Sequence, residues 1–177
     1  TSDHGESFSH GYGAHTGPAL YNDLVHIPLI VKLPGQRASV RSSVVAEQID
    51  IAPTIAQIAG IPRPAGWEGI SLMNAARGDE SASTMSEDDA FSMNFEENPR
   101  RAALTRGSVA VILGNRKLIH YLGALHYAFM PPLHDELYDL ASDPGEHANI
   151  AAEHPQEVTR LLGLIDEQLA RHGGRLN

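Results

Sequence analysis

The sequence predicts an α/β fold in which the end of a mixed sheet is followed by a small antiparallel sheet and a C-terminal helix. Short β-prone runs separated by Gly- and Pro-containing turns predict the strands. The middle and the end of the chain carry apolar residues at helical spacing, which predicts helices there. With 177 residues, 42% of them apolar and 20% charged, the chain is long enough to bury a core and has the composition of a globular protein.

The first half of the chain predicts two strands and a helix. Residues 27–33 form a mostly apolar run closed by a Pro-Gly pair, which indicates a buried strand that ends in a turn. Residues 42–45 predict a second short strand. Apolar residues recur at helical spacing over 51–59, with Asp50 before them and Gly60 after them, so this segment predicts a short capped helix.

The second half predicts a loop, a meander and a long helix. Residues 77–100 contain few apolar residues and many Asp, Glu, Ser and Asn residues, which predicts an exposed loop. Three β-prone runs, at 102–105, 109–113 and 117–121, are separated by Arg-Gly and Gly-Asn pairs, a pattern typical of an antiparallel meander. A helix is predicted over 155–171, because a proline suits its first position and the apolar residues that follow lie along one face.

Charge and composition exclude several classes of function. The formal net charge of -9, with 13 scattered Lys and Arg residues, argues against a nucleic-acid-binding surface. No apolar run approaches the roughly 20 residues that a membrane-spanning helix requires. The absence of cysteine excludes disulfides, thiolate-bound zinc and thiol catalysis within this chain. The chain opens at Thr1 without an initiator methionine or a signal-peptide pattern, which predicts an excised fragment.

The segment of residues 1–6, with the sequence TSDHGE, places a carboxylate beside an imidazole. Asp3 and His4 therefore offer two metal ligands on adjacent residues. Adjacent side chains of a regular strand point to opposite faces, so both reach one metal only where the strand ends in a loop, and Gly5 permits the backbone conformations of such a loop. For an isolated pair, the competing interpretation is a hydrogen-bonded Asp-His turn.

Two further histidines, His10 and His15, follow in the Gly-rich segment 9–17. An imidazole can bind a metal, donate a hydrogen bond to an anion or protonate a leaving group near neutral pH. The alternative for each of them is a surface histidine in a flexible loop. Because these histidines lie close to Asp3 and His4 in sequence, the segment is the candidate functional site.

Several sequence motifs, taken in order, resemble the sulfatase family of the alkaline phosphatase superfamily. In the site segment these motifs are TSDHGE at 1–6, HTG at 15–17, LYND at 20–23 and IPLIV at 27–31. Later in the chain they are IDIAPT at 49–54, EGISL at 68–72, ELYDL at 136–140 and DPGE at 143–146. The resemblance covers nearly the whole chain and implies the C-terminal part of an alkaline phosphatase-like sandwich.

The resemblance implies a division of the chain into three parts. Residues 1–76 would be the C-terminal part of a sulfatase catalytic α/β domain. Residues 77–100 would be an exposed acidic loop, and residues 101–177 a subdomain made of the small antiparallel sheet and the C-terminal helix.

The resemblance also implies roles for the site residues. Asp3 and His4 correspond to the second pair of ligands of one divalent metal ion, and His15 to the residue that contacts the sulfate. The spacing from His15 to Tyr21 is one residue longer than the family's commonest pattern, so His10 is a rival for the catalytic role. Calcium is the metal implied by the family, whereas the imidazole of His4 favours manganese or zinc, because calcium prefers oxygen ligands.

The family's nucleophile is a formylglycine, formed from the Cys or Ser of a Cys/Ser-x-Pro-x-Arg motif. No such motif occurs between Thr1 and Asn177. The resemblance therefore implies that the nucleophile and the first pair of metal ligands precede this chain, and that the chain is inactive by itself.

The resemblance implies hydrolysis of a sulfuric ester in a small molecule or a glycan. Other readings stay open. The Asp-His form of the metal pair also occurs in family members that cleave phosphonate or phosphate esters, and the site segment resembles zinc-dependent phosphoethanolamine transferases of the same superfamily, whose nucleophile is a threonine. A non-catalytic relative that acts as a binding module is a further alternative.

The charged residues of the second half are expected to be structural. Asp139 and the segment 143–146 have the composition of turns and caps. The cations Arg100, Arg101 and Lys117 could reach an anionic substrate, but edge-strand or solvated positions are favoured for them.

Overall fold

The computed structural model describes residues 1–11, 13, 15, 17–79, 89–95, 106–123 and 134–171. The chain forms two compact units, one made of Thr1–Pro28 with Phe91–Asn177 and the other of Leu29–Ala90, and each is described by itself. Among the described residues, no helix has the length and apolar character needed to cross a membrane. The division into three parts at residues 76 and 100, which the family resemblance implies, stays a prediction.

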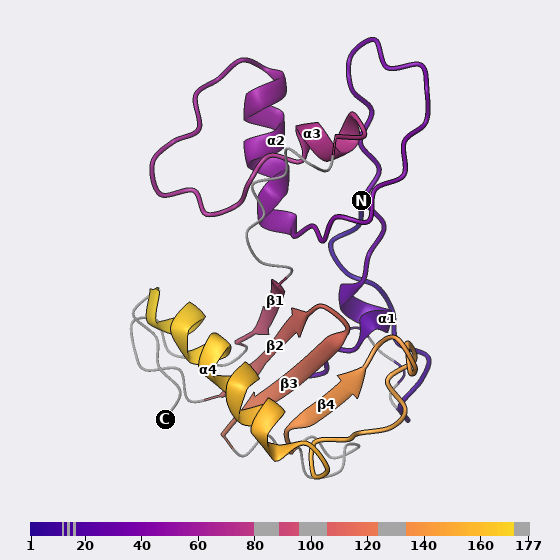
Figure 1. The fold of residues 1–177 in the computed structure, drawn as a ribbon, viewed down its shortest axis with the longest axis vertical. Coiled ribbons are helices and arrows are strands. Elements are labelled where there is room, and N and C mark those ends of the chain that lie inside the picture. Colours follow the sequence, from indigo (N-terminus) through magenta and orange to yellow (C-terminus); the bar gives the residue numbers. More distant parts are fainter. Residues whose placement is uncertain are drawn as a thin grey trace. The chain divides into compact units, whose positions relative to one another are not determined.

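The first unit is built on a four-stranded sheet in the order β1-β2-β3-β4 (Figure 1). Its strands are β1 (Asp89–Asn94), β2 (Gly107–Leu113), β3 (Arg116–Leu122) and β4 (Glu136–Asp139). β3 pairs antiparallel with β2 and with β4. The turn between β2 and β3 uses Gly114 at φ +58°, a backbone conformation that favours glycine. The predicted strands at 109–113 and 117–121 are therefore confirmed, and the run at 102–105 lies outside the described residues.

One face of this sheet packs against α4 (Pro155–Arg171), as Figure 1 shows. Leu161, Ile165 and Leu169 follow one side of the helix and are 0–2% exposed. They pack with alternate strand residues, because successive strand side chains point to opposite faces; these are Val109, Val111, Leu118, Leu122 and Leu137. The predicted C-terminal helix is confirmed over its whole length.

The other face of the sheet is covered by residues 18–25, which include the one-turn helix α1 (Asn22–Val25). Leu20, Tyr21 and Leu24 are buried there with the strand residues of that face, which are Ala110, Ile119, Tyr121 and Tyr138. Ser108 Oγ donates to the Pro18 carbonyl at 2.5 Å, which ties the segment to β2. The sheet thus supports the segment that follows the candidate site directly in sequence.

Three sequence-based expectations for strands and loops were wrong. Residues 27–33 and 42–45 are not strands, and Ile30 is 85% exposed, because no described segment supplies a partner strand there. β1 lies within the range 77–100 that was expected to be a loop. Phe91 packs against the cluster under α4, and pairing with β2 outweighs the polar composition.

The second unit contains η1 (Gln48–Asp50), α2 (Ile51–Ile58) and α3 (Met73–Ala76). The buried Asp50 carboxylate accepts the backbone N–H of Glu47 at 2.9 Å and that of Ile70 at 2.8 Å. Thr54 Oγ1 accepts the N–H of Leu72 at 2.9 Å. These bonds fix the helix start against residues 70–72. The predicted short helix is confirmed over Ile51–Ile58, but Asp50 does not cap it, because its carboxylate accepts from Glu47 and Ile70 instead.

Candidate functional site

Asp3 and His4 lie on an exposed, irregular segment, and their side chains approach each other. His4 Nε2 is 3.7 Å from Asp3 Oδ2. His4 Nδ1 is 2.7 Å from the Gly5 carbonyl, and since a carbonyl only accepts, Nδ1 carries the proton and the lone pair of neutral His4 lies on Nε2. Hydrogen bonds from its own backbone N–H and that of His4, with the charge of His4, lower the pKa of the Asp3 carboxyl. This pair therefore presents an anionic oxygen and an imidazole nitrogen side by side.

The Asp3-His4 turn rests on α1. The N–H of Gly5 donates to the carbonyl of Leu24 at 2.8 Å. A Cβ on Gly5 would lie 1.9 Å from the Asp23 carbonyl oxygen, so the close approach of the two backbones requires glycine.

His15 lies beside His4. The two rings stack with centroids 4.7 Å apart and planes 15° apart. His15 Nδ1 is 2.8 Å from Glu6 Oε2, and because an ionised carboxylate only accepts, Nδ1 carries the proton and Nε2 is left for another partner. Glu6 was not predicted as a site residue, since nothing in its spacing to His15 indicates the pairing. The structure thus brings Asp3, His4 and His15 together.

His10, the rival of His15, has different neighbours. Its ring stacks on Tyr21 at 3.8 Å between centroids and lies 5.5 Å from the ring of His147. Its backbone has φ +57°, which is uncommon for a residue other than glycine. Among the described residues its buried Nε2 has no hydrogen-bond partner. His10 therefore packs against Tyr21, the residue that precedes α1, and not against His4.

We expect His10 to titrate below the ordinary histidine value. Burial lowers the pKa of its imidazole, and this effect outweighs the carboxylates of Asp23 and Glu146, which oppose it. His10 in the unfolded chain binds a proton more readily than His10 in the folded protein. The contribution of neutral His10 to the free energy of unfolding is therefore present above about pH 6.5 and is lost as the pH falls through the lowered pKa. An NMR titration of the histidine-labelled intact protein measures the midpoint. A midpoint at or above 6.5 contradicts this, and His10→Asn, which tolerates the backbone angle, is the control that removes the titration.

Lys117 is fully buried, so the expectation of an edge or solvated position was wrong for this residue. Its Nζ is 2.6 Å from Glu146 Oε1, and the two side chains are 0% and 1% exposed. Burial lowers the pKa of Lys117, while the negative charge of Glu146 opposes the shift. Burial was not predicted because the partner that makes it possible is distant in sequence. Arg100 and Arg101 lie outside the described residues.

Asp143 and Asp139 have the structural roles predicted for them. The Asp143 carboxylate accepts the backbone N–H groups of His147 and Ala148 at 2.8 Å each, and these bonds lower its pKa. Asp139 Oδ1 accepts the N–H of Ala141 at 3.1 Å in the turn after β4, and its Oδ2 pairs with Arg116 at 3.2 Å. Glu146, in the same turn, instead has φ +56° and directs its side chain into the interior toward Lys117.

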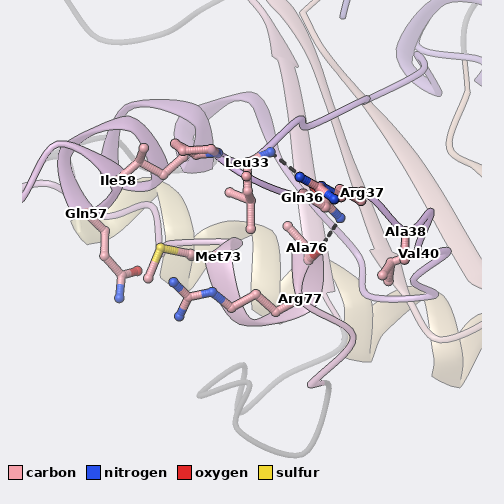
Figure 2. A pocket seen from close by; sticks show the side chains of 12 residues that line it. Leu33, Gln36, Arg37, Ala38, Val40, Gln57, Ile58, Met73, Ala76 and Arg77 are labelled. Carbon is pink, nitrogen blue, oxygen red and sulfur yellow. Dashed lines mark hydrogen bonds between the residues drawn. The ribbon is translucent and has the colours of Figure 1, made fainter.

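A pocket of about 540 Å³ lies in the second unit (Figure 2). It is formed by residues 33–40, the end of α2 and α3, and Gln36 Nε2 donates to the Ala76 carbonyl at 3.1 Å beside it. Its described lining contains the guanidinium groups of Arg37 and Arg77 but no histidine or carboxylate. The site residues predicted from the sequence lie in the first unit.

The described residues do not contain a complete metal site. No group of three or more His, Asp or Glu side chains among them is arranged to hold a metal ion. Asp3 and His4 nevertheless fit two ligands of one ion, because Asp3 Oδ2 lies 3.7 Å from His4 Nε2 and the His4 tautomer leaves Nε2 available.

Comparison with known proteins shows where the chain belongs. The family model "N-sulphoglucosamine sulphohydrolase, C-terminal" matches residues 11–172. Arylsulfatase K of Bos taurus is 32% identical over 167 residues, which cover 92% of this chain and 28% of that protein. Delta 4,5-hexuronate-2-O-sulfatase of Bacteroides thetaiotaomicron is 26% identical over 176 residues, covering 96% of this chain and 34% of that protein.

Solved structures agree with these relatives. The structure of a 2-O GAG sulfatase superposes with a TM-score of 0.73 and 26% identity, over 96% of this chain and 35% of that one. A phosphonate monoester hydrolase from Silicibacter pomeroyi, with a TM-score of 0.52 and 22% identity over 72% of this chain and 24% of that one, shares the fold. The predicted fold class, the C-terminal part of an alkaline phosphatase-like sandwich with a small antiparallel sheet and a C-terminal helix, is confirmed.

The chain spans 28% of the length of Arylsulfatase K and 35% of the solved 2-O GAG sulfatase. The family match over residues 11–172 agrees with the fold and with the order of the sequence motifs, since all three indicate a sulfatase. The chain belongs to the N-sulphoglucosamine sulphohydrolase C-terminal family and is the C-terminal portion of a sulfatase-family protein.

Proposed function

We propose that the protein that carries this chain is a metal-dependent sulfatase, in which Asp3 and His4 bind the metal and His15 contacts the sulfate group. The observation that carries this proposal is the meeting of the three side chains. The His4 and His15 rings stack 4.7 Å apart, and the Asp3 carboxylate lies 3.7 Å from His4. His15 is thus close enough to the two ligands to reach an anion bound beside the same ion.

A divalent metal bound there supplies a positive charge that stabilises negative charge on the sulfuryl oxygens and orients the nucleophile. The residues of the chain have complementary tasks. The Gly5 carbonyl holds the His4 ring in the tautomer that exposes Nε2, and Glu6 orients His15 so that its Nε2 points away from the carboxylate. A His15 Nε2 that carries a proton can donate it to a sulfate oxygen or to the leaving oxygen.

The identities of the metal and of the nucleophile are further parts of the proposal. The resemblance to sulfatases implies calcium, but the imidazole of His4 suits manganese or zinc better than calcium, which prefers oxygen ligands. The formylglycine nucleophile and the other metal ligands are expected outside this chain, which would leave the chain inactive by itself.

The proposed substrate is a sulfated glycan. Two relatives point to this class: one is named a hexuronate-2-O-sulfatase, and a structural relative is described as a 2-O GAG sulfatase. Both match 96% of the chain. His15 would contact the ester group while Asp3 binds the metal, and the sugar specificity would depend on loops around them.

The test is hydrolysis by the intact protein, stripped of metal and then supplied with calcium, manganese or zinc. An aryl sulfate is compared with an aryl phosphate and an aryl phosphonate. We expect sulfate cleavage that is lost with the metal and restored by one of the three ions. Preference for a phosphorus ester would assign the protein to the phosphohydrolase branch of the fold, and absence of activity with every ion and ester would favour a non-catalytic relative.

A further inference from the structure

The buried ion pair between β3 and the turn after β4 has no part in the proposed chemistry, yet it makes direct contact with α1. Lys117 Nζ donates to Asn22 Oδ1 at 2.9 Å, and the backbone N–H of Asn22 donates to Glu146 Oε2 at 2.5 Å. The pair therefore contacts both the side chain and the main chain of the first residue of α1. Since α1 has only four residues, these contacts fix its position to a degree that its own hydrogen bonds cannot.

α1 in turn holds the Asp3-His4 turn. Leu24 accepts the Gly5 N–H at 2.8 Å, and the Gly5 carbonyl accepts from His4 Nδ1 at 2.7 Å. On the neighbouring residue, the Asp23 carboxylate accepts hydrogen bonds from Ser7 and Ser9, which follow the turn in sequence. A continuous series of contacts therefore leads from the ion pair to the imidazole of His4.

The cost of this arrangement suggests that it has a function. Two charges at 0% and 1% exposure are expensive to bury, and an apolar pair of similar volume often stabilises a fold equally well. Glu146 also has a backbone φ of +56°, an unfavourable conformation for this residue type. The rest of this face is filled mainly by apolar and aromatic side chains, and its other polar groups, Ser108 and the Glu136 carboxylate, are satisfied by neutral partners, so packing alone does not require an ion pair there.

We propose that Lys117 and Glu146 are positioning residues, which hold the Asp3-His4 turn in the geometry needed for metal binding by fixing Asn22 and α1. This inference rests on the proposed function only in assigning the turn to a metal. The positioning itself concerns the described contacts among β3, the segment 143–146, α1 and Gly5. Neither residue is assigned a contact with substrate.

The test compares three variants of the intact protein. Lys117→Met/Glu146→Leu removes both charges, so stability should stay near that of the wild type, since no charge is left buried alone. Its metal affinity, measured by competition with a chelator, should fall by about 10- to 100-fold, the range seen when groups that orient ligands are lost. Asn22→Ala removes only the side-chain acceptor and should shift the affinity in the same direction by less. If the double variant does not fold, the metal affinity of Asn22→Ala tests the positioning role instead.

Arg116→Met is the matched control. Arg116 is the neighbour of Lys117 on β3, and its pairs with Asp139 and Glu157 are partly exposed. The Arg116→Met substitution should lower the melting temperature slightly and leave the metal affinity unchanged. If the double variant keeps both its stability and its metal affinity, or if affinity merely follows melting temperature across all variants, the positioning role is wrong.

Hydrogen exchange of the Gly5 amide separates this inference from the proposed function. In the double variant this exchange should be at least about tenfold faster in the absence of metal, because opening of the Gly5–Leu24 bond becomes easier. A wild-type protein that binds no metal would refute the sulfatase proposal, while faster exchange in the variant would still support the positioning. Unchanged exchange would refute the positioning, whatever the metal does.

Discussion

Replacing Asp3 by alanine in the intact protein is expected to lower kcat/KM for sulfate ester hydrolysis by about 10³-fold or more. The variant would lose the anionic ligand that Asp3 is proposed to supply, a carboxylate whose pKa is held below its ordinary value by backbone hydrogen bonds. A metal acting on transition-state charge contributes several kcal/mol, and each 1.36 kcal/mol is a factor of ten in rate. The loss should appear in kcat and in chelator-measured metal affinity together. His4→Ala should behave in the same way, because it removes the adjacent donor.

Asp3→Asn and Glu153→Ala complete this experiment. The asparagine keeps an oxygen ligand without the charge, so its metal affinity should lie between those of the wild type and the alanine variant. Glu153 is an exposed carboxylate in the turn before α4, and its removal should leave activity unchanged. Full activity after Asp3→Ala would remove the residue from the metal site and, with it, the main support for the proposed function.

The parts of the fold that the sequence predicted are those specified by local pattern. The β2–β3 hairpin follows from two β-prone runs and a Gly-Asn turn, and α4 from one apolar face with a proline at its start. β1 was missed because a polar composition decided the prediction, whereas pairing with β2 and the packing of Phe91 decided the structure. The strand expected at 27–33 failed for the same reason, since strands form only with a partner.

The residues of the candidate site could be predicted from the sequence, but the contacts that hold them in place could not. Asp3 and His4 are adjacent in sequence, so their pairing needed only an irregular backbone. Spacing left His10 and His15 as rivals, and the structure puts His15 against His4 and His10 against Tyr21. The Lys117–Glu146 pair joins elements far apart in the chain, and a lysine in a strand gives no local signal of burial.

Replacing Gly5 by alanine is expected to reduce kcat/KM by about 100-fold, the effect of displacing reacting groups by about 1 Å. The added Cβ would lie 1.9 Å from the carbonyl oxygen of Asp23 and 3.3 Å from the Cα of Leu24. Both atoms belong to the backbone of α1, so neither can rotate away as a side chain would. The turn itself must move, which breaks the Gly5–Leu24 bond and shifts the ring of His4 that the Gly5 carbonyl holds.

Gly13→Ala is the control that separates this displacement from a general effect of alanine in the segment. Among the described residues, no atom lies within 4 Å of a Cβ built on Gly13, so activity and metal affinity should stay within about twofold of the wild type. The Gly5 variant should show weaker metal binding with a melting temperature that changes little, because the residues of the turn are not members of the hydrophobic clusters described on the two faces of the sheet. If Gly5→Ala instead binds metal like the wild type, the geometry of the Asp3-His4 turn does not control the metal, and the ligand assignment itself fails.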